Sequence, residues 1–311
     1  METLYLVIPC YNEEDMLPIT SKALLQKMNS LIESGKIAPD SKVMFVDDGS
    51  KDKTWELIEV LHNFSPMFTG LKLSRNKGHQ NALLAGLMTA KNYADIIVSM
   101  DADLQDDINA IDGFLEKRAE GCDIVYGVRS SREKDTAFKR GTAQGYYKIL
   151  AKMGVEITYN HADYRLMSKR AVEGLAEFKE VNLFLRGLVP MVGYNSDIVT
   201  YVRAERQAGE SKYPLKKMIS FAMEGITSLS VKPISFITAL GVIVFLISLI
   251  ILIGSIIAGN SASMTIIMAS IWALGGLQLA AIGIIGEYIG KIYLESKARP
   301  KFIIETNLEE I

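Results

Sequence analysis

The chain carries Ile96-Ile97-Val98-Ser99-Met100-Asp101-Ala102-Asp103-Leu104-Gln105, an apolar run that ends directly in two carboxylates and an amide. The apolar half predicts a buried strand, and residues two apart in extended backbone point to the same side. Asp101, Asp103 and Gln105 are therefore expected to converge, while Ala102 and Leu104 pack the other way. Oxygen ligands of this kind suit Mg²⁺ or Mn²⁺, which take further ligands from water and substrate phosphates. The stretch predicts a metal site for a diphosphate at the end of a strand.

Two other kinds of site do not fit the acidic stretch. An EF-hand loop would need Gly where Asp106 stands and Glu where Asp112 stands. A P-loop would need G-x-x-x-x-G-K-[ST], which occurs nowhere in the chain. A solvated acidic turn after a strand is the alternative that stays open.

Apolar, strand-like runs alternate with amphipathic stretches along the first part of the chain. The runs are residues 5–8, 43–46, 71–73, 96–100 and 124–126. Such alternation predicts an α/β, Rossmann-like fold with a mostly parallel sheet and flanking helices. Open sheets of this class bind ligands beyond the carboxyl ends of their strands.

Polar segments follow four of these runs. They are Pro9-Cys10-Tyr11-Asn12-Glu13-Glu14, Asp47-Asp48-Gly49-Ser50-Lys51-Asp52-Lys53-Thr54, Arg75-Asn76-Lys77-Gly78-His79-Gln80-Asn81 and residues 101–107. Any one of them could be a turn or a helix cap, since Asn, Asp, Gly and Ser commonly fill those positions. Four in succession on one edge of a parallel sheet indicate a binding edge.

These motifs, in this order and at these spacings, resemble family 2 glycosyltransferases with a GT-A nucleotide-sugar-binding fold. With His161-Ala162-Asp163-Tyr164-Arg165-Leu166-Met167 and an apolar tail, the closer resemblance is to polyprenyl-phosphate glycosyltransferases. These include dolichol-phosphate mannose synthase and the bactoprenol glucosyltransferases of bacteria. The resemblance covers essentially the whole chain, and the ordered set of motifs is more specific than any single one.

The resemblance implies an inverting transfer of a hexose to undecaprenyl or another polyprenyl phosphate, giving a lipid-linked sugar for cell-envelope glycans. The expected donor is UDP-glucose. A UDP-N-acetylhexosamine, a modified pentose donor and GDP-mannose are alternatives. From a different functional class, a non-catalytic membrane scaffold or transport subunit with the same fold is the competing hypothesis.

The resemblance also assigns residues to the donor. Its nucleotide-sugar pocket comprises Pro9, Tyr11, Asn12, Glu13, Asp47, Asp48, Arg75, Lys77 and Asp101. Tyr11 offers a flat apolar face, and Asp47 or Asp48 offers an acceptor for a base N–H. One member of this acidic pair could instead cap the following helix. Asp101, Asp103 and Gln105 are the metal ligands, with Asp101 also near the ribose and Asp103 essential for catalysis.

Phosphate binding and acceptor chemistry are assigned in the same way. The segment Arg206-Gln207-Ala208-Gly209-Glu210-Ser211-Lys212 resembles the family's R-x-x-G-x-S-K signature. The phosphate-binding residues are expected to be Arg129, Arg140, Arg206, Ser211 and Lys212, because guanidinium groups suit bidentate phosphate contacts. Asp163 is the catalytic residue on the acceptor side, either as a base or by orienting the acceptor. A base is not strictly needed, since a phosphate monoester is mostly ionised at neutral pH. The structural alternative for Asp163 is a helix cap or a salt bridge to Arg165 or Arg170.

Residues 233–286 form a run of 54 positions without Asp, Glu, Lys, Arg or His. A single span needs about 20 apolar residues, so the run predicts two membrane helices, near 234–258 and 264–289. Basic residues flank the run, at 212, 216, 217 and 232 before it and at 291, 297, 299 and 301 after it. The turn at 259–263 has none, so both termini are expected in the cytoplasm. A buried soluble hairpin is the alternative.

The remaining sequence completes the expected organisation. Residues 1–213 form a cytosolic catalytic domain, 214–231 an amphipathic helix on the bilayer, and 291–311 a cytosolic tail. The N-terminus shows no signal-peptide pattern, so the globular part is expected to stay in the cytosol. The two predicted spans place the protein in the cell membrane. The balance of 34 basic and 36 acidic residues gives no footprint for nucleic acid. Cys10 and Cys122 have no C-x-x-C spacing and are assigned no function. Assembly into a homo-oligomer is left open as an expectation.

Overall fold

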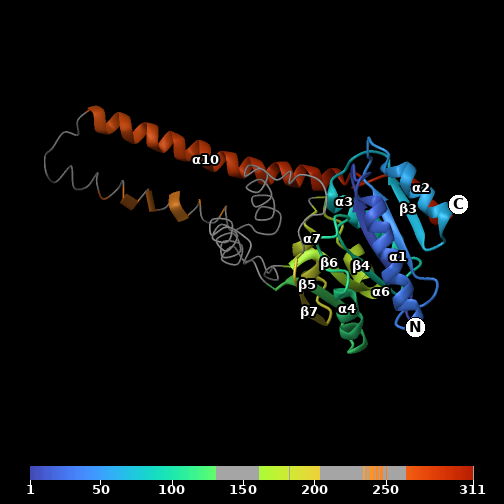
Figure 1. Cartoon of the computed structure of the whole chain (residues 1–311). Helices are drawn as coiled ribbons and strands as arrows, with labels where there is room; N and C mark the ends of the chain where they lie inside the picture. The colour runs from blue at the N-terminus through green and yellow to red at the C-terminus, as the bar shows by residue number, and fades with distance from the viewer. Residues whose placement is uncertain are drawn as a thin grey trace. The chain divides into compact units, whose positions relative to one another are not determined.

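The structure is a computed structural model (Figure 1). It describes residues 1–130, 161–181, 183–203 and 264–310, together with ten single positions between 234 and 250. The predicted amphipathic helix at 214–231 and the candidate phosphate ligands Arg140, Arg206, Ser211 and Lys212 lie outside the described residues.

Eight strands among the described residues form one mixed sheet, in the order β7-β5-β6-β4-β1-β2-β3-β8. The strands are β1 (Leu4–Cys10), β2 (Lys42–Asp47), β3 (Phe68–Leu73), β4 (Ile96–Ser99), β5 (Ile124–Arg129), β6 (His161–Ser168), β7 (Ser196–Tyr201) and β8 (Ile304–Asn307). All five predicted strands are confirmed. The sheet is mixed because β6 runs antiparallel to both β4 and β5, and β8 runs antiparallel to β3.

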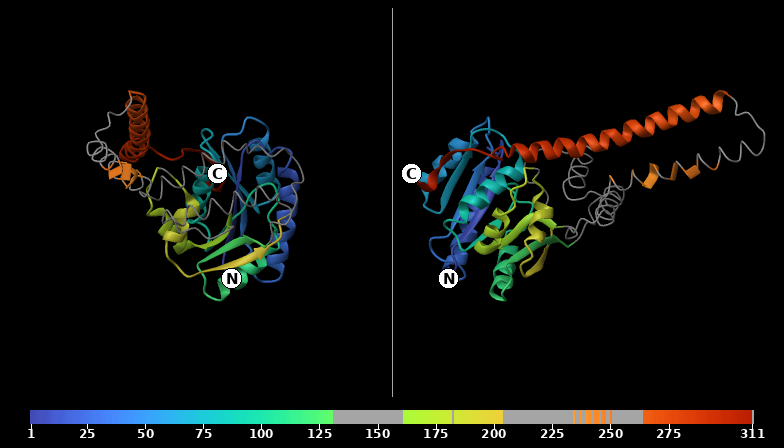
Figure 2. Two further views of the ribbon diagram at one scale, coloured as in Figure 1. Left: turned by 90° about the vertical axis from the view of Figure 1, so that its left-hand side faces the viewer. Right: turned by 180° about the vertical axis from the view of Figure 1, so that it is seen from behind.

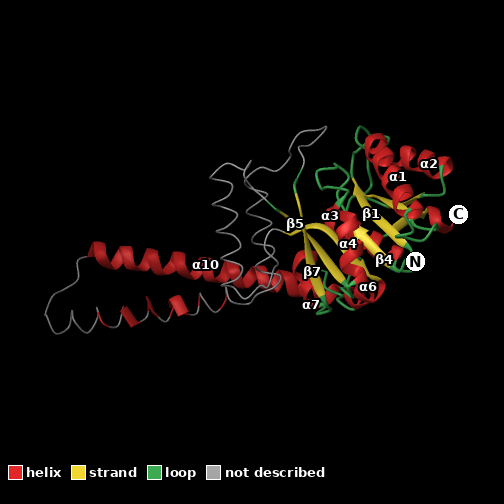
Figure 3. Cartoon of the chain, turned by 60° about the horizontal axis from the view of Figure 1, so that its bottom comes forward, coloured by secondary structure: helices red, strands yellow, loops and turns green. Residues whose placement is uncertain are grey.

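Helices cover both faces of this sheet (Figure 3). They are α1 (Leu17–Glu33), α2 (Thr54–Phe64), α3 (His79–Ala90), α4 (Ala110–Ala119), α6 (Lys169–Ala176) and α7 (Leu185–Met191). Alternation along β1 divides them, because successive strand residues point to opposite faces. Leu4, Leu6 and Ile8 join the core formed with α1, α2 and α4. Val7 points to α3, where Gly86 allows contact: a Cβ there would lie 2.4 Å from Val7 Cγ1.

The reversed strand β6 sets up the binding edge. Strands β1 to β4 are parallel, so their carboxyl ends meet on one edge of the sheet. Because β6 is antiparallel to β4, its amino-terminal residues lie on that same edge, with Arg165 paired to Ser99. Asp163 therefore comes from the start of its strand, whereas Asp101 follows the end of β4.

Hydrogen bonds join the first two polar strand ends. Asn12 sits in the left-handed region at φ 53° and takes part twice, its N–H donating to Ser50 Oγ and its Oδ1 accepting from Lys51 N. Glu13 N donates to Thr54 Oγ1 at 2.9 Å. The segments after β1 and β2 are thus held together as one surface.

The second and third strand ends are joined through Asp48. Its two carboxylate oxygens accept from Lys77 N at 2.7 Å and Gly78 N at 2.8 Å. Gly49, at φ 65°, lets the segment after β3 approach closely, because a Cβ there would lie 2.6 Å from Arg75 C. Asp48 thereby fixes the start of α3.

The C-terminal residues return to the sheet (Figure 2, where the red C-terminal segment lies along the blue strands). Strand β8 pairs with β3, and Glu309 contacts Lys42 at 2.8 Å and Tyr5 Oη at 3.0 Å. Residues 300–311 belong to the same compact unit as the other strands. Within the predicted cytosolic tail at 291–311, residues Ile304–Asn307 form β8, which pairs with the edge of the sheet at β3.

The apolar run contains one described helix long and apolar enough to span a membrane. This helix, α10, covers Met264–Lys297 and includes the predicted span 264–289; its candidate spanning part is Leu274–Lys297. The first predicted span, 234–258, lies mostly outside the described residues, and its described positions are helical. The two-helix hairpin therefore stays a prediction.

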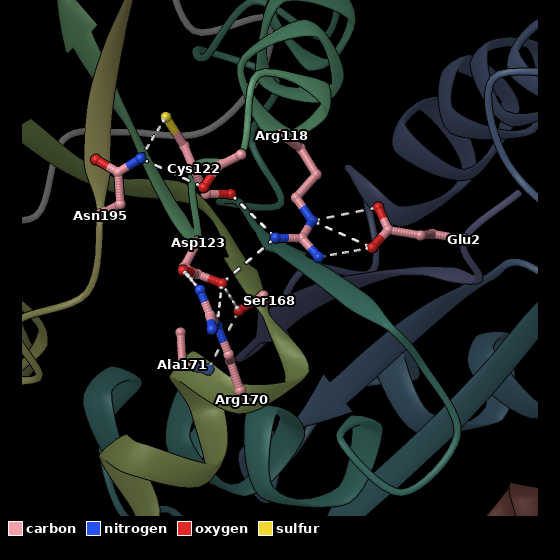
Figure 4. A network of polar contacts seen from close by, with 9 residues as sticks. Glu2, Arg118, Cys122, Asp123, Ser168, Arg170, Ala171 and Asn195 are labelled. Carbon is pink, nitrogen blue, oxygen red and sulfur yellow. Dashed lines mark hydrogen bonds and ion pairs between the residues drawn. The ribbon is translucent and has the colours of Figure 1, made fainter.

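An ionic network centred on the buried carboxylate of Asp123 lies at the opposite edge of the sheet (Figure 4). Asp123, just before β5, has a side chain that is 1% exposed and accepts from Ser168 Oγ at 2.8 Å and Arg170 Nε at 2.6 Å. Arg118 reaches the same carboxylate at 3.3 Å and holds Glu2 at 2.8 Å. Arg170 and Ser168 lower the pKa of Asp123 against the effect of burial.

We expect Asp123→Asn to destabilise the sheet domain by on the order of 2 kcal/mol, which is below the cost for a fully enclosed pair because Arg170 is largely hydrated. The depressed pKa means that the carboxylate stabilises the fold above its unfolded pKa, near 4, and that this contribution disappears as pH falls through the folded pKa. Thermal unfolding of purified protein from pH 7 to pH 3 measures both effects. The gap between wild type and variant should be constant near neutrality and close below about pH 4.

The matched control is Asp197→Asn, whose exposed carboxylate contacts Lys117 at 3.0 Å. Its unfolding midpoint should match that of the wild type. Equal midpoints for Asp123→Asn and wild type at pH 7 would contradict the anchoring role.

We expect Asp48→Asn to loosen the start of α3, because an amide has one acceptor oxygen where the carboxylate has two. Hydrogen exchange at the Lys77 and Gly78 amides should accelerate by at least about tenfold, the effect of losing one charge-assisted hydrogen bond. Asp47→Asn is the control, since Asp47 accepts from Ser50 N instead. Unchanged exchange in Asp48→Asn would disprove the role given to this carboxylate.

Candidate active site

The acidic stretch after β4 forms a turn at the binding edge. The strand ends at Ser99, and Leu104 adopts φ 52°, so the expected extended backbone through residue 105 is wrong. The predicted alternation of burial nevertheless holds. Ala102 and Leu104 are buried, while Asp101, Asp103 and Gln105 are partly exposed. The turn keeps the three oxygen-bearing side chains toward solvent and the apolar ones in the core.

A charged cluster, which we call the Asp163 cluster, lies beside this turn and comprises His79, Asp101, Asp163, Arg165 and Arg186. Arg165 Nη2 donates to Asp163 Oδ1 at 2.8 Å. Arg186 donates through Nε at 3.2 Å and Nη2 at 3.0 Å to the two carboxylate oxygens. His79 Nε2 lies 3.6 Å from Asp101 Oδ1 and 3.7 Å from Asp163 Oδ2. One imidazole thus lies within 4 Å of carboxylates from both the acidic turn and β6.

The charges of this cluster shift two pKa values. Burial raises the pKa of Asp163, but Arg186, His79 and Arg165 outweigh it and hold the pKa well below its ordinary value. Burial lowers the pKa of His79, yet the Asp163 and Asp101 carboxylates raise it to about 9. The cluster therefore contains an ionised carboxylate enclosed by cationic groups at neutral pH.

A second cluster, the Asp106 cluster, lies at the ends of β5 and β7. Asp106 is buried and accepts a 2.5 Å hydrogen bond from Tyr201 Oη. Arg129 Nη2 lies 3.7 Å from Asp106, and the buried Arg129 Nε has no hydrogen-bond partner among the residues that the structure describes. Arg203 donates to Gln105 Oε1. Burial and the charge of Asp101 raise the pKa of Asp106. This cluster places two guanidinium groups next to the acidic turn.

The residues predicted for the nucleotide occupy the neighbouring strand ends. The ring of Tyr11 is 41% exposed, and Arg75 is exposed, whereas Pro9 is buried within β1. Lys77 is partly exposed and donates its N–H to Asp48. The observed contacts of Asn12, Glu13, Asp47 and Asp48 are the hydrogen bonds that shape this surface.

Several site residues were not identified from the sequence. They are His79, Asp106, Arg186, Tyr201 and Arg203. Arg186 had one sequence signal, since it is a single charge in the apolar run 183–189. His79 lies in a polar segment that the sequence marked as a strand end, but its partners are 22 and 84 positions away, so no local spacing could reveal them.

The oxygen atoms that the acidic turn offers are of the kind that a hard divalent cation prefers as ligands. Asp101, Asp103 and Gln105 supply carboxylate and amide oxygens from one turn, and all three are accessible. Within the described ranges no group of three or more His, Cys, Asp or Glu residues is arranged to hold a metal. Such a cation would therefore need further ligands from water or from substrate phosphates, as Mg²⁺ commonly does.

Comparisons with known proteins place this chain among glycosyltransferases. Residues 5–175 match the glycosyl transferase family 2 model. The uncharacterized glycosyltransferase YkoT of Bacillus subtilis (strain 168) is 54% identical, over 98% of this chain and 92% of that protein. The bactoprenol glucosyl transferase of Shigella phage SfV is 39% identical, over 98% and 99%. The prophage bactoprenol glucosyl transferase homolog of Escherichia coli (strain K12) is 39% identical, over 96% and 97%.

Among solved structures, glucosyl-3-phosphoglycerate synthase from Mycobacterium tuberculosis, in complex with Mn²⁺, UDP and phosphoglyceric acid, shows 18% identity and a TM-score of 0.45. The matched region covers 73% of this chain and 77% of the synthase chain. The family model spans more than half of the chain, and the sequence relatives cover nearly all of it. The chain therefore belongs to glycosyltransferase family 2, and the protein is a glycosyltransferase.

Proposed function

We propose that the protein transfers a hexose from a nucleotide sugar to a polyprenyl phosphate. The observation that carries this proposal is the position of the Asp163 cluster beside the acidic turn, since one edge then offers a place for a diphosphate and a place for a second phosphate. Relatives that are named bactoprenol glucosyl transferases and align over nearly the whole chain support the acceptor. Their names also favour glucose, and we propose UDP-glucose as the donor.

In this proposal the acidic turn holds the metal. Asp101, Asp103 and Gln105 would hold Mg²⁺ or Mn²⁺. The cation would neutralise the negative charge that develops on the departing diphosphate. Arg129 and Arg203, at the adjacent strand ends, contribute positive charge beside it. Tyr11 stacks on the base, while Asn12, Glu13, Asp47, Asp48, Arg75 and Lys77 form the walls of the nucleotide pocket together with Pro9.

The reaction is a single displacement with inversion. An oxygen of the lipid phosphate attacks the anomeric carbon, the bond from that carbon to the diphosphate oxygen breaks, and the nucleoside diphosphate leaves with the electron pair. The attacking phosphate is mostly dianionic at neutral pH, so little or no proton has to be removed. Arg140, Arg206, Ser211 and Lys212 remain candidates for the phosphates of either substrate.

We further propose that the protein crosses the cell membrane twice, with the catalytic domain and both termini in the cytoplasm. The strand β8 supports an even number of crossings, because the chain leaves the sheet after β7 and pairs with the same sheet again after α10. With α10 as one span, a second must precede it. The charge-free residues 234–258 and the basic residues on both flanks agree with that arrangement.

Membranes containing the protein should transfer labelled hexose from UDP-glucose to undecaprenyl phosphate, with EDTA abolishing the transfer and Mg²⁺ or Mn²⁺ restoring it. Parallel incubations with UDP-N-acetylglucosamine and GDP-mannose test the alternative donors. Asp103→Asn should lower transfer by at least about 100-fold because a charged metal ligand becomes neutral.

Asp107→Asn is the matched control, since Asp107 lies in the same acidic segment and its Oδ1 accepts from Asn109 N, which an amide oxygen can also do. Its activity should equal that of the wild type. No lipid-linked label from any donor would refute the proposed reaction, and full activity in EDTA would refute the metal dependence.

Single cysteines test the two crossings. In intact spheroplasts, a membrane-impermeant maleimide should label Ser261→Cys, in the predicted external turn, and should leave Ser34→Cys, in an exposed turn after α1, unlabelled until permeabilisation. The native Cys10 and Cys122 are buried and give little background. Protection of position 261 in intact spheroplasts would contradict the two-span arrangement.

A further inference from the structure

The carboxylate of Asp163 is fully engaged by protein groups. Oδ1 accepts from Arg165 and Arg186, and Oδ2 accepts from Arg186 and faces His79 at 3.7 Å. A carboxylate has about four lone-pair positions, so these contacts occupy its capacity. Its side chain is only 12% exposed, and its backbone oxygen accepts from Ser99 Oγ at 2.5 Å. Asp163 can take a proton from a substrate only by giving up one of these contacts.

The two arginines around Asp163 differ in exposure. The side chain of Arg165 is 2% exposed and lies within the sheet, whereas that of Arg186 is 33% exposed. Arg186 is also the partly exposed member of a run whose neighbours from 184 to 189 are buried. Its Nε and Nη2 form a two-pronged contact with Asp163, which fixes the plane of the guanidinium group. Asp163 therefore holds a cation at a set orientation at the edge of the site.

The charges of this pair favour an anion. Two guanidinium groups contact the one carboxylate. A partly exposed guanidinium group whose orientation is fixed by a carboxylate suits recognition of a phosphate. Arg186 is joined to Asp101 of the acidic turn through two intervening side chains, because it contacts Asp163, and His79 lies within 4 Å of both Asp163 and Asp101.

The geometry of the reaction separates its two phosphates. In an inverting displacement the attacking oxygen approaches the anomeric carbon from the side opposite the leaving group. The acceptor phosphate must then lie roughly a sugar ring away from the diphosphate that the metal holds. We therefore assign Arg186 to the acceptor side of His79, whereas Arg129 and Arg203 contact Asp106 and Gln105 in the acidic segment.

We propose that Arg186 binds the phosphate monoester of the acceptor, and that Asp163 is the positioning residue for Arg186 and does not act as a base. The proposal rests on the polyprenyl-phosphate acceptor proposed above. It adds a binding residue and gives Asp163 a different task from proton transfer.

Two binding measurements without turnover test the proposal on the detergent-solubilised full chain. Farnesyl phosphate serves as a probe for the acceptor site, and UDP with Mn²⁺ serves as a probe for the donor site. Arg186→Gln should weaken farnesyl phosphate binding by at least about tenfold, the effect of losing a charged hydrogen bond, and leave UDP binding unchanged. Arg186→Lys should recover part of the loss. Lys169→Gln, an exposed cation at the start of α6, is the matched single-charge control and should bind both probes as the wild type does.

Kinetics separate positioning from base catalysis. Asp163→Asn should raise the KM for the acceptor as Arg186→Gln does, and the double variant should be no worse than the more impaired single variant, because both remove one interaction. Arg186→Gln leaves Asp163 paired with Arg165, so this variant tests the proposal even where Asp163→Asn fails to fold.

Three outcomes would overturn the proposal. Wild-type farnesyl phosphate binding by Arg186→Gln would remove the assigned role, and a selective loss of UDP binding would assign Arg186 to the donor. A lower kcat with unchanged acceptor KM in Asp163→Asn would restore the base. Failure of the wild type itself to bind farnesyl phosphate and to transfer sugar would instead refute the acceptor class, and with it this inference.

Discussion

The antiparallel insertion of β6 between β4 and β5 is the constraint on which the active site depends. Pairing of β4 with β6 ends at Ser99 and Arg165. Two residues beyond that pair on each strand stand Asp101 and Asp163, one at the end of a strand and the other near the start of its neighbour. The reversal thus brings together two acidic groups that are 62 positions apart, and the Ser99 hydroxyl fixes the second by donating to its backbone oxygen. A fully parallel sheet would send the start of β6 to the opposite edge.

The protein uses charged clusters for two separate purposes at the two edges of the sheet. At one edge Asp123 ties β5, β6 and the N-terminal residues together through Arg118, Arg170 and Ser168, and it has no access to the binding edge. At the other edge the Asp163 and Asp106 clusters hold arginines in fixed orientations close to an accessible acidic turn. Charges fixed in advance stabilise a developing charge without having to reorganise during the reaction. The binding edge therefore has the electrostatic character expected of phosphate-dependent chemistry.

The C-terminal strand β8 returns the chain to the sheet after the apolar helix α10. A run of charged and polar residues after an apolar helix resembles a solvated tail, yet Ile304–Asn307 complete the sheet and Glu309 contacts Lys42 and Tyr5. The pairing covers the edge of β3, which would otherwise present unpaired backbone groups. The same sheet thus contains strands from both sides of the apolar run.

The sequence alone determined the α/β class, the five strands up to residue 129 and the alternating burial of residues 101–105, because these follow from local periodicity and from the polar residues that end each strand. It also determined the apolar run, since 54 positions without charge need no tertiary information. Only the tertiary structure decided that the sheet is mixed, that β8 closes it, that Asp48 fixes the start of α3, and that His79 and Arg186 meet Asp163. Those facts depend on strand direction and on contacts between distant residues, and neither leaves a periodic signal in the chain. The role of Asp163 shows the difference. The sequence offered a carboxylate that could be a base. The structure surrounds it with three cationic neighbours from α3, β6 and α7, and the proposal above therefore gives it the task of orienting Arg186.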